Sequence, residues 1–403
     1  MDRPLARLIA DGIDIYEASF TALDAYHGLS PAPIRFIAAS CSLVELARKF
    51  DRLEYPGLPY ADAALSPPPS GIDEGPWPVI ALPERPRHPR DRSGASASQD
   101  TESATTEAPS FFFRCVESLK SIERSAFPQL DLLREPRSGV FFDPQGIYPW
   151  LRKKRTETRV ASAEEELFQA VVLASRYAYE FDEDYVPPLP RRFEAQSQRN
   201  LLALLLPSAH PERGLELLRR SGFLEAFWPE LDSLAGVGQA KEHHPEGDAW
   251  QHTLETFQYR KAPELRLSLA LLLHDAGKPR ATPMEGRKFD RHAEIGGTMA
   301  ERFLRGLGYP EKIISDVSFL VRYHMMPAAL PRLPYFRTRH VVEDSRFPLL
   351  LELYKCDEFS TFRGPDAYYE ACAAYRAILK NSKNPFRDPE GRKLAHIFLG
   401  GEL

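Results

Sequence analysis

Six residues in the C-terminal part of the sequence carry side chains that bind divalent metal ions. They are His252, the adjacent pair His274 and Asp275, then His292, His324 and Asp357. Imidazole and carboxylate together suit borderline metals such as Mn, Fe, Ni or Zn, and a set without a thiolate argues against a closed structural zinc site. A metal ion with an open coordination position activates water beside a phosphate. The set therefore predicts a metal centre that hydrolyses phosphoesters.

The pair His274 and Asp275 follows an apolar segment. The sequence LRLSLALLLHDAGKP (265–279) predicts a buried helix that ends near Gly277 and Pro279. Burying an ionised carboxylate costs several kcal/mol unless it is paired or bound to a metal ion. Asp275 therefore requires a partner, and a divalent cation supplies one.

The spacing of these residues resembles that of a known family. The order H…HD…D resembles the HD superfamily of metal-dependent phosphohydrolases. Four segments narrow the resemblance to the HD domain of bacterial CCA-adding tRNA nucleotidyltransferases and the related poly(A) polymerase family. They are HHPEGDAWQHT (243–253), LLLHDAGKPRATP (271–283), FDRHAEIGG (289–297) and VRYHMMP (321–327).

The resemblance implies a ligand set for a divalent metal ion, which could be Mn, Ni, Fe, Mg or Zn. Asp357, in LELYKCDEFSTFRG (351–364), matches the closing aspartate of the family, and Asp275 would also orient the attacking water. The implied ligands of the first ion are His252, His274, Asp275 and Asp357.

Three further residues have catalytic roles implied by the same resemblance. Lys278 matches a lysine that neutralises substrate phosphate, although it could also interact with the dipole at the end of the preceding helix, a contribution of about 0.3 to 1 kcal/mol. His292 and His324 match positions that bind a second metal ion in some relatives. In others they contact phosphate and protonate the leaving oxygen. Both alternatives are open at this point.

The N-terminal half resembles the same enzymes, but residues needed for nucleotidyl transfer are absent. In the family a tyrosine-led strand runs into Gly-Gly, and the next strand carries two magnesium-binding carboxylates. Here Tyr16 leads the strand, Ser19 and Phe20 replace the glycines, and Ile34 and Phe36 occupy the carboxylate positions. Two-metal nucleotidyl transfer fails without those carboxylates. This half is therefore predicted to be a catalytically eroded scaffold.

Another carboxylate pair is available nearby. Asp11 and Asp14 precede the strand, however, and no Gly-Gly lies upstream of them. Their position does not match the family's carboxylates. A CCA-type nucleotidyltransferase accordingly remains the alternative function, together with a non-catalytic RNA-binding protein.

Periodicity and the resemblance together predict an α+β fold that is mostly α. The expected parts are a small mixed-sheet nucleotidyltransferase-like domain (1–160) with a flexible Pro/Ser-rich insertion (66–110), a helical neck (161–240), an all-α HD domain (241–380) and a C-terminal tail (381–403). Helices of the HD domain are expected near 249–259, 264–275, 292–306, 310–324, 346–360 and 366–379.

Composition excludes several classes of protein. The 403 residues suffice for two or three domains, and neither an apolar segment long enough to span a bilayer nor a secretory signal is evident, so a cytoplasmic location is expected. Four cysteines without a CxxC motif indicate reduced thiols.

The charge of the chain bears on its partners. A net charge of −5 gives no general attraction to nucleic acid, although the basic residues 152–155 and 191–192 offer local contacts for RNA. The predicted substrate is a phosphoester, either a nucleotide or an RNA end. No membrane partner is expected, and the oligomeric state is left open.

Overall fold

The computed structural model describes residues 2–58, 60–67, 109–118, 122, 124–238, 248–284, 287–361 and 364–380. The chain forms two compact units. The first contains residues 1–169 and 180–183, and the second contains residues 170–179 and 184–403. Most of the predicted insertion (66–110) and all of the tail (381–403) lie outside the described residues. The four-part division expected from the sequence stays a prediction.

The first unit is built on a seven-stranded mixed sheet. Its strands are β1 (Ile15–Ala18), β2 (Ile34–Ala39), β3 (Leu53–Glu54), β4 (Ala63–Leu65), β5 (Ser110–Cys115), β6 (Leu133–Arg134) and β7 (Phe141–Phe142). They are ordered β3-β4-β5-β2-β1-β6-β7. Only β2 and β5 pair in parallel, and the other neighbours are antiparallel. β5 begins at Ser110, the last residue of the predicted insertion.

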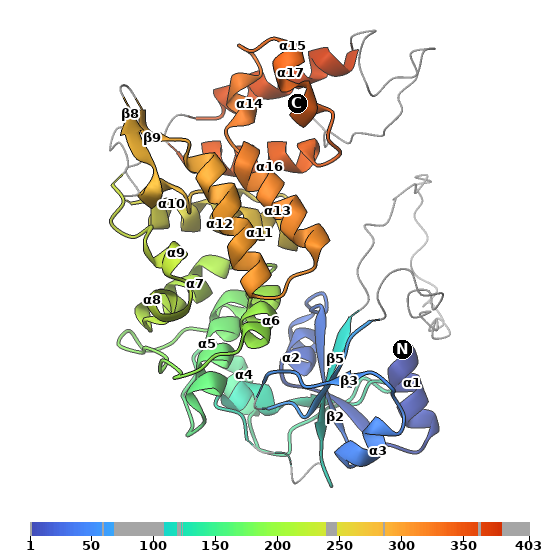
Figure 1. Cartoon of the computed structure of the whole chain (residues 1–403). Coiled ribbons are helices and arrows are strands. Elements are labelled where there is room, and N and C mark those ends of the chain that lie inside the picture. Colours follow the sequence, from blue (N-terminus) through green and yellow to red (C-terminus); the bar gives the residue numbers. More distant parts are fainter. Residues whose placement is uncertain are drawn as a thin grey trace, which may run out of the picture. The chain divides into compact units, whose positions relative to one another are not determined.

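Helices cover both faces of this sheet (Figure 1). They are α1 (Arg3–Ala10), α2 (Ser19–His27), α3 (Leu43–Ala47), α4 (Tyr148–Arg152), the 3-10 helix η2 (Pro128–Asp131) and the first half of α5 (Ala163–Tyr177). Side chains alternate between the faces of a strand. Ile37 and Phe113 therefore pack with α1 and α3, whereas Phe36 contacts Phe20 of α2 on the opposite face.

The second unit is mainly helical. After the end of α5 its helices are α6 (Ala195–Leu205), α7 (Pro211–Arg220), α8 (Phe223–Phe227), α9 (Pro229–Asp232), α10 (Ala249–Thr256), η3 (Phe257–Tyr259), α11 (Leu265–Leu273), η4 (Lys278–Arg280), α12 (His292–Gly306), α13 (Glu311–Tyr323), α14 (Met326–Ala329), α15 (Tyr335–Val342), α16 (Phe347–Phe359) and α17 (Asp366–Lys380). The six predicted helices all form, with ends within two residues when η3 is counted with α10. The predicted fold class, α+β and mostly α, is confirmed.

A small hairpin departs from the all-α domain expected here. It consists of β8 (Thr282–Met284) and β9 (Arg287–Asp290), with Thr282 paired to Asp290. Strands of three and four residues show no clear alternation in a sequence, so the pairing that forms them is not visible there. The short helices α14 and α15 were likewise not predicted.

The apolar helix α11 lies at the centre of the packing that positions the histidines. Its leucines from 267 to 273 are buried, and it packs against α13 and α16 (Figure 1). The turn after α11 approaches the start of α12 closely at Gly277. Only glycine fits there, because an added Cβ would lie 2.1 Å from the carbonyl oxygen of His292. The turn after α11 therefore contacts the first residue of α12 through main-chain atoms.

Candidate metal centre

The predicted ligands lie on five elements of the second unit and meet at one place. His252 is in α10, His274 is the C-cap of α11 with Asp275 next to it, His292 opens α12, His324 is the C-cap of α13, and Asp357 is in the last turn of α16. The structure thus brings all six together, and their roles as ligands remain predictions.

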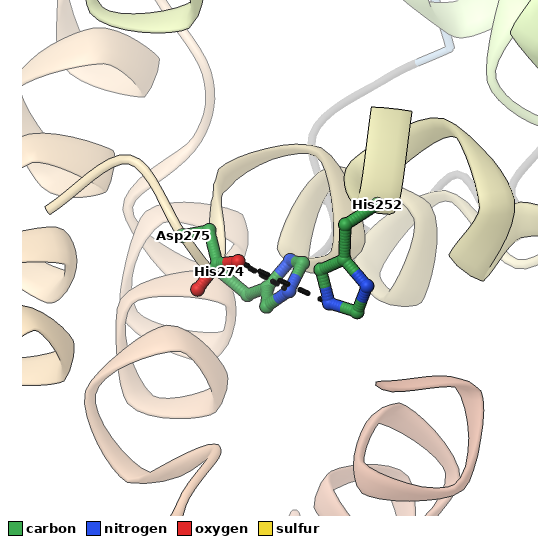
Figure 2. Close-up of side chains that lie close together, drawn as sticks. All are labelled: His252, His274 and Asp275. Carbon is green, nitrogen blue, oxygen red and sulfur yellow. Dashed lines mark ion pairs between the residues drawn. The ribbon is translucent and has the colours of Figure 1, made fainter. Parts of the chain in front are cut away.

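The first group of ligand atoms surrounds one oxygen of Asp275. Its Oδ2 lies 3.4 Å from His274 Nε2 and 3.9 Å from His252 Nε2, and Figure 2 shows both imidazoles pointing toward this carboxylate. Asp357 Oδ1 closes the group, at 2.9 Å from His252 Nε2 and 3.8 Å from His274 Nε2. Ligand atoms of His252, His274 and Asp275 all lie within 4.8 Å of one another, as a shared metal ion requires.

The second group surrounds the other oxygen of Asp275. Its Oδ1 lies 3.9 Å from His292 Nε2, which in turn lies 3.2 Å from His324 Nε2. These three residues also satisfy the 4.8 Å limit. Asp275 therefore belongs to both groups and presents one oxygen to each.

Hydrogen bonds to the main chain fix the tautomers of three histidines. In each, Nδ1 lies 2.7 to 2.9 Å from the carbonyl oxygen of the residue three positions earlier. A carbonyl only accepts, so Nδ1 carries the proton and Nε2 keeps its lone pair. The three pairs are His274 with Leu271, His292 with Phe289 and His324 with Val321.

Burial and neighbouring charges set protonation states that suit metal binding. Burial lowers the pKa of His274 and of His324, so that both imidazoles are neutral at neutral pH. Burial alone would raise the pKa of Asp275, but His274 and Lys278 outweigh it and hold that pKa well below its usual range. Neutral imidazoles beside an ionised carboxylate are the forms that bind a metal ion.

Two features of the geometry fit a divalent cation. The buried Nε2 of His274 has no hydrogen-bond partner within the described part of the chain, whereas the nearby Asp275 Oδ2 is paired with Lys278 Nζ at 2.6 Å. Buried polar atoms rarely lack a hydrogen-bond partner. In addition, the lone pairs of His292 Nε2 and His324 Nε2 face each other at 3.2 Å, which is unfavourable without a cation or proton between them.

Lys278 lies at this centre. Besides its ion pair with Asp275, its Nζ lies 5.6 Å from the centroid of the Phe289 ring. A cation over an aromatic ring is attracted to the ring face. These two contacts aim the ammonium group toward the ligands, where it can meet an anionic substrate.

One residue beside the ligands was not recognised in the sequence. Ser360 follows α16, and its Oγ lies 3.3 Å from His252 Nδ1. It comes three residues after Asp357, a spacing that places both on one side of a helix. That spacing is common in sequences, so it signals a second contact to His252 only once α10 and α16 are known to pack together.

In the first unit, apolar side chains occupy the two positions that the family resemblance aligns with magnesium-binding carboxylates. Ile34 and Phe36 are buried, and the Phe36 ring packs against Phe20, Phe112 and Tyr60 with centroids 5.5 to 6.1 Å apart. The alternative carboxylate Asp11 forms a surface ion pair with Lys49 at 2.9 Å. Neither Ile34 nor Phe36 can therefore supply a carboxylate to a divalent metal ion.

The first residue of α2 has a backbone conformation that glycine favours. Ser19 has φ of 50°, in the left-handed region, and its buried Oγ has no hydrogen-bond partner among the described residues. A cavity of about 60 Å³ lies beside it, lined in part by Phe36, Tyr60 and Gln169.

Comparison with known proteins agrees with these features. Residues 249–339 match the HD domain family. The CC-adding tRNA nucleotidyltransferase of Thermus thermophilus is 35% identical over 204 residues, which are 48% of this chain and 45% of that protein. The Multifunctional CCA protein of Halorhodospira halophila is 41% identical over 128 residues, which are 31% of this chain and 30% of that protein. Each alignment thus spans less than half of the relative.

The fold has a counterpart among solved structures. The crystal structure of the Bacillus stearothermophilus CCA-adding enzyme in complex with CTP matches with a TM-score of 0.51 and 15% identity, over 94% of this chain and 84% of that one. At this identity the likeness concerns the fold alone. Residues 249–339 are therefore an HD domain, in a chain that resembles CCA-adding tRNA nucleotidyltransferases in part of its sequence and in its fold.

Proposed function

We propose that this protein is a metal-dependent phosphohydrolase whose HD domain cleaves a phosphoester of a nucleotide or an RNA end. The observation that carries the proposal is the sharing of Asp275 between two groups of imidazoles in a buried site. His252, His274, Asp275 and Asp357 would hold a divalent cation. When bound, such an ion acidifies a water molecule and polarises a phosphoryl oxygen.

The remaining residues would act on the substrate. Lys278, already aimed at the ligands, would neutralise phosphate charge. Asp275 would orient the attacking water, because its Oδ1 faces away from the first group. His292 and His324 would either complete a second cation site or contact phosphate and donate a proton to the leaving oxygen.

RNA or a nucleotide as the substrate is supported by the name of the Thermus thermophilus relative, a CC-adding tRNA nucleotidyltransferase. The basic residues 152–155 and 191–192 are exposed, as contact with phosphates requires. Within the described residues, no helix is both long enough and apolar enough to cross a membrane. A cytoplasmic location remains the expectation.

Nucleotidyl transfer is the second candidate, because the Thermus thermophilus relative is named for it. Against it stand the apolar side chains of Ile34 and Phe36 at the positions that the family resemblance aligns with carboxylates. The first unit would then serve as a scaffold.

The test uses the full chain, stripped of metal by a chelator and reloaded with Mn²⁺, Ni²⁺, Mg²⁺ or Zn²⁺. Aryl phosphates, cyclic nucleotides and an RNA with a 2',3'-cyclic phosphate end form the substrate panel. We expect metal-dependent hydrolysis of at least one, with none from His274→Ala. Absence of hydrolysis across the panel contradicts the proposal. Incorporation of CTP or ATP into tRNA that persists in His274→Ala would support the second candidate.

A further inference from the structure

The two ring nitrogens of His252 contact two residues at the C-terminal end of α16. Asp357 Oδ1, in the last turn, lies 2.9 Å from Nε2, and Oγ of the C-cap residue Ser360 lies 3.3 Å from Nδ1. These two residues are three positions apart in the sequence and contact the imidazole from opposite ends. Both His252 and Ser360 are buried, so solvent does not replace these contacts.

His252 differs in this respect from the other three histidines of the site. Their Nδ1 atoms face main-chain carbonyls, which accept hydrogen bonds and cannot donate them. His252 Nδ1 faces a hydroxyl, which can do either. That hydroxyl also lies 2.7 Å from the carbonyl oxygen of Asp357, to which it donates when it accepts from His252.

We propose that Ser360 is a positioning residue that lets His252 change tautomer when a divalent cation binds. The inference rests on the proposed metal centre and adds a residue to it. Without metal, Nε2–H donates to Asp357 Oδ1 and Nδ1 accepts from the Ser360 hydroxyl. With metal, Nε2 gives up its proton to solvent and provides its lone pair, while Nδ1 takes up a proton and donates to Ser360 Oγ. The ring is neutral in both states.

The Ser360 hydroxyl therefore forms a hydrogen bond with His252 Nδ1 both with and without metal. A carbonyl at the same place could only accept, so it would keep the proton on Nδ1. In the metal-free protein, Nε2 would then have no proton to donate to Asp357. Partners of this kind orient a metal-binding histidine, and their removal typically costs about 10-fold to 100-fold in metal affinity. Ser360→Ala should show a loss of that size. Ser360→Thr keeps the hydroxyl and should retain affinity close to that of the unmodified protein.

The experiment titrates metal-free full-length protein with Zn²⁺ in competition with a chromogenic chelator. Thr361→Ala is the matched control, because the Thr361 hydroxyl bonds the carbonyl oxygen of Glu358 at the same helix end and has no assigned place in the site. Equal affinity in Ser360→Ala and the unmodified protein overturns the inference, as does an equal loss in Thr361→Ala or in Ser360→Thr. Failure of the unmodified protein to bind Zn²⁺ contradicts the proposed function instead.

A second measurement reads the tautomers directly. In ¹⁵N-histidine-labelled protein, the protonated nitrogen of His252 should change from Nε2 to Nδ1 when Zn²⁺ is added, while His274 keeps Nδ1 protonated throughout. His274 serves as the internal reference, because a carbonyl fixes it. A His252 ring with Nδ1 protonated in both states overturns the inference even where affinity changes.

Discussion

The two units of this protein differ in whether they bury a charged side chain. In the second unit Asp275 is almost fully buried and stays ionised among imidazoles and an ammonium group. In the first unit the positions that the family resemblance aligns with carboxylates hold Ile34 and Phe36, which pack into an apolar core. A carboxylate is retained in an interior only where other groups compensate its charge. At these two positions aromatic and aliphatic packing fills the interior, and no buried charge has to be compensated.

The sharpest test of this contrast is Asp275→Asn. The change removes the charge shared by both groups of ligands, so we expect metal binding to fail and hydrolysis to fall by about 10³-fold, equivalent to about 4 kcal/mol of transition-state stabilisation. Steady-state kinetics with the most active substrate give the measurement. Asp11→Asn, at a surface ion pair, is the control and should keep its activity within about twofold. Retention of a tenth of the activity in Asp275→Asn would refute the assigned centre.

Phe36→Asp tests the first unit. Placing a carboxylate in the cluster formed with Phe20 and Phe112 removes a large side chain and buries an unpaired charge, so we expect the first unit to lose about 3 to 5 kcal/mol of stability. Hydrogen exchange in β2 and β5 measures it. Phe36→Leu keeps an apolar side chain and should cost less than about 1.5 kcal/mol. A stable Phe36→Asp protein that adds nucleotides to tRNA would show that the site is dormant rather than lost.

His324→Ala separates the two groups of ligands within the second unit. We expect kcat to fall by about 10²-fold, because His324 supplies a ligand atom to the second group and not to the first, while the Kd of the first metal ion changes less than about tenfold. His252→Ala should instead abolish binding of that ion. Metal stoichiometry distinguishes the two roles of His324: a fall from two ions to one indicates a second cation site, and one ion in both proteins indicates phosphate contact. Equal loss of the first ion in both variants would contradict the division into groups.

The smallest effect concerns the metal-free protein and pH. Because burial lowers the pKa of His274 and His324, the unfolded chain takes up protons near pH 6.5 while the folded protein does not. Folding stability therefore falls as pH drops below about 6.5, by about 1 kcal/mol between pH 7.5 and 6.0. Urea denaturation at the two pH values measures it. His274→Gln should reduce the dependence, and a stability that rises toward pH 6.0 would reverse the assigned sign.

The sequence predicted six helices of the second unit from local patterns, and it named the six residues that meet at the candidate metal centre, whose roles as ligands stay predictions. The leucines of α11 and the HD pair that follows are contiguous, and the ends of α12 and α13 carry their own stop signals. The contact of Ser360 with His252 could not be predicted, because it joins residues 108 positions apart through the packing of α10 and α16. Two-residue strands such as β6 and β7 could not be predicted either, because they are defined only by their pairing with neighbouring strands.

One consequence follows from the main-chain contact at Gly277. A single methyl group there would overlap the His292 carbonyl, and Gly296 N would lie 2.7 Å away on the same side. The distance between His274 and His292 is thus set by direct contact between the main chains that carry them, and no side chain at position 277 could change it. A saturation library screened for phosphate release should find this position as intolerant as any of the six predicted ligands, although it contributes no functional group of its own.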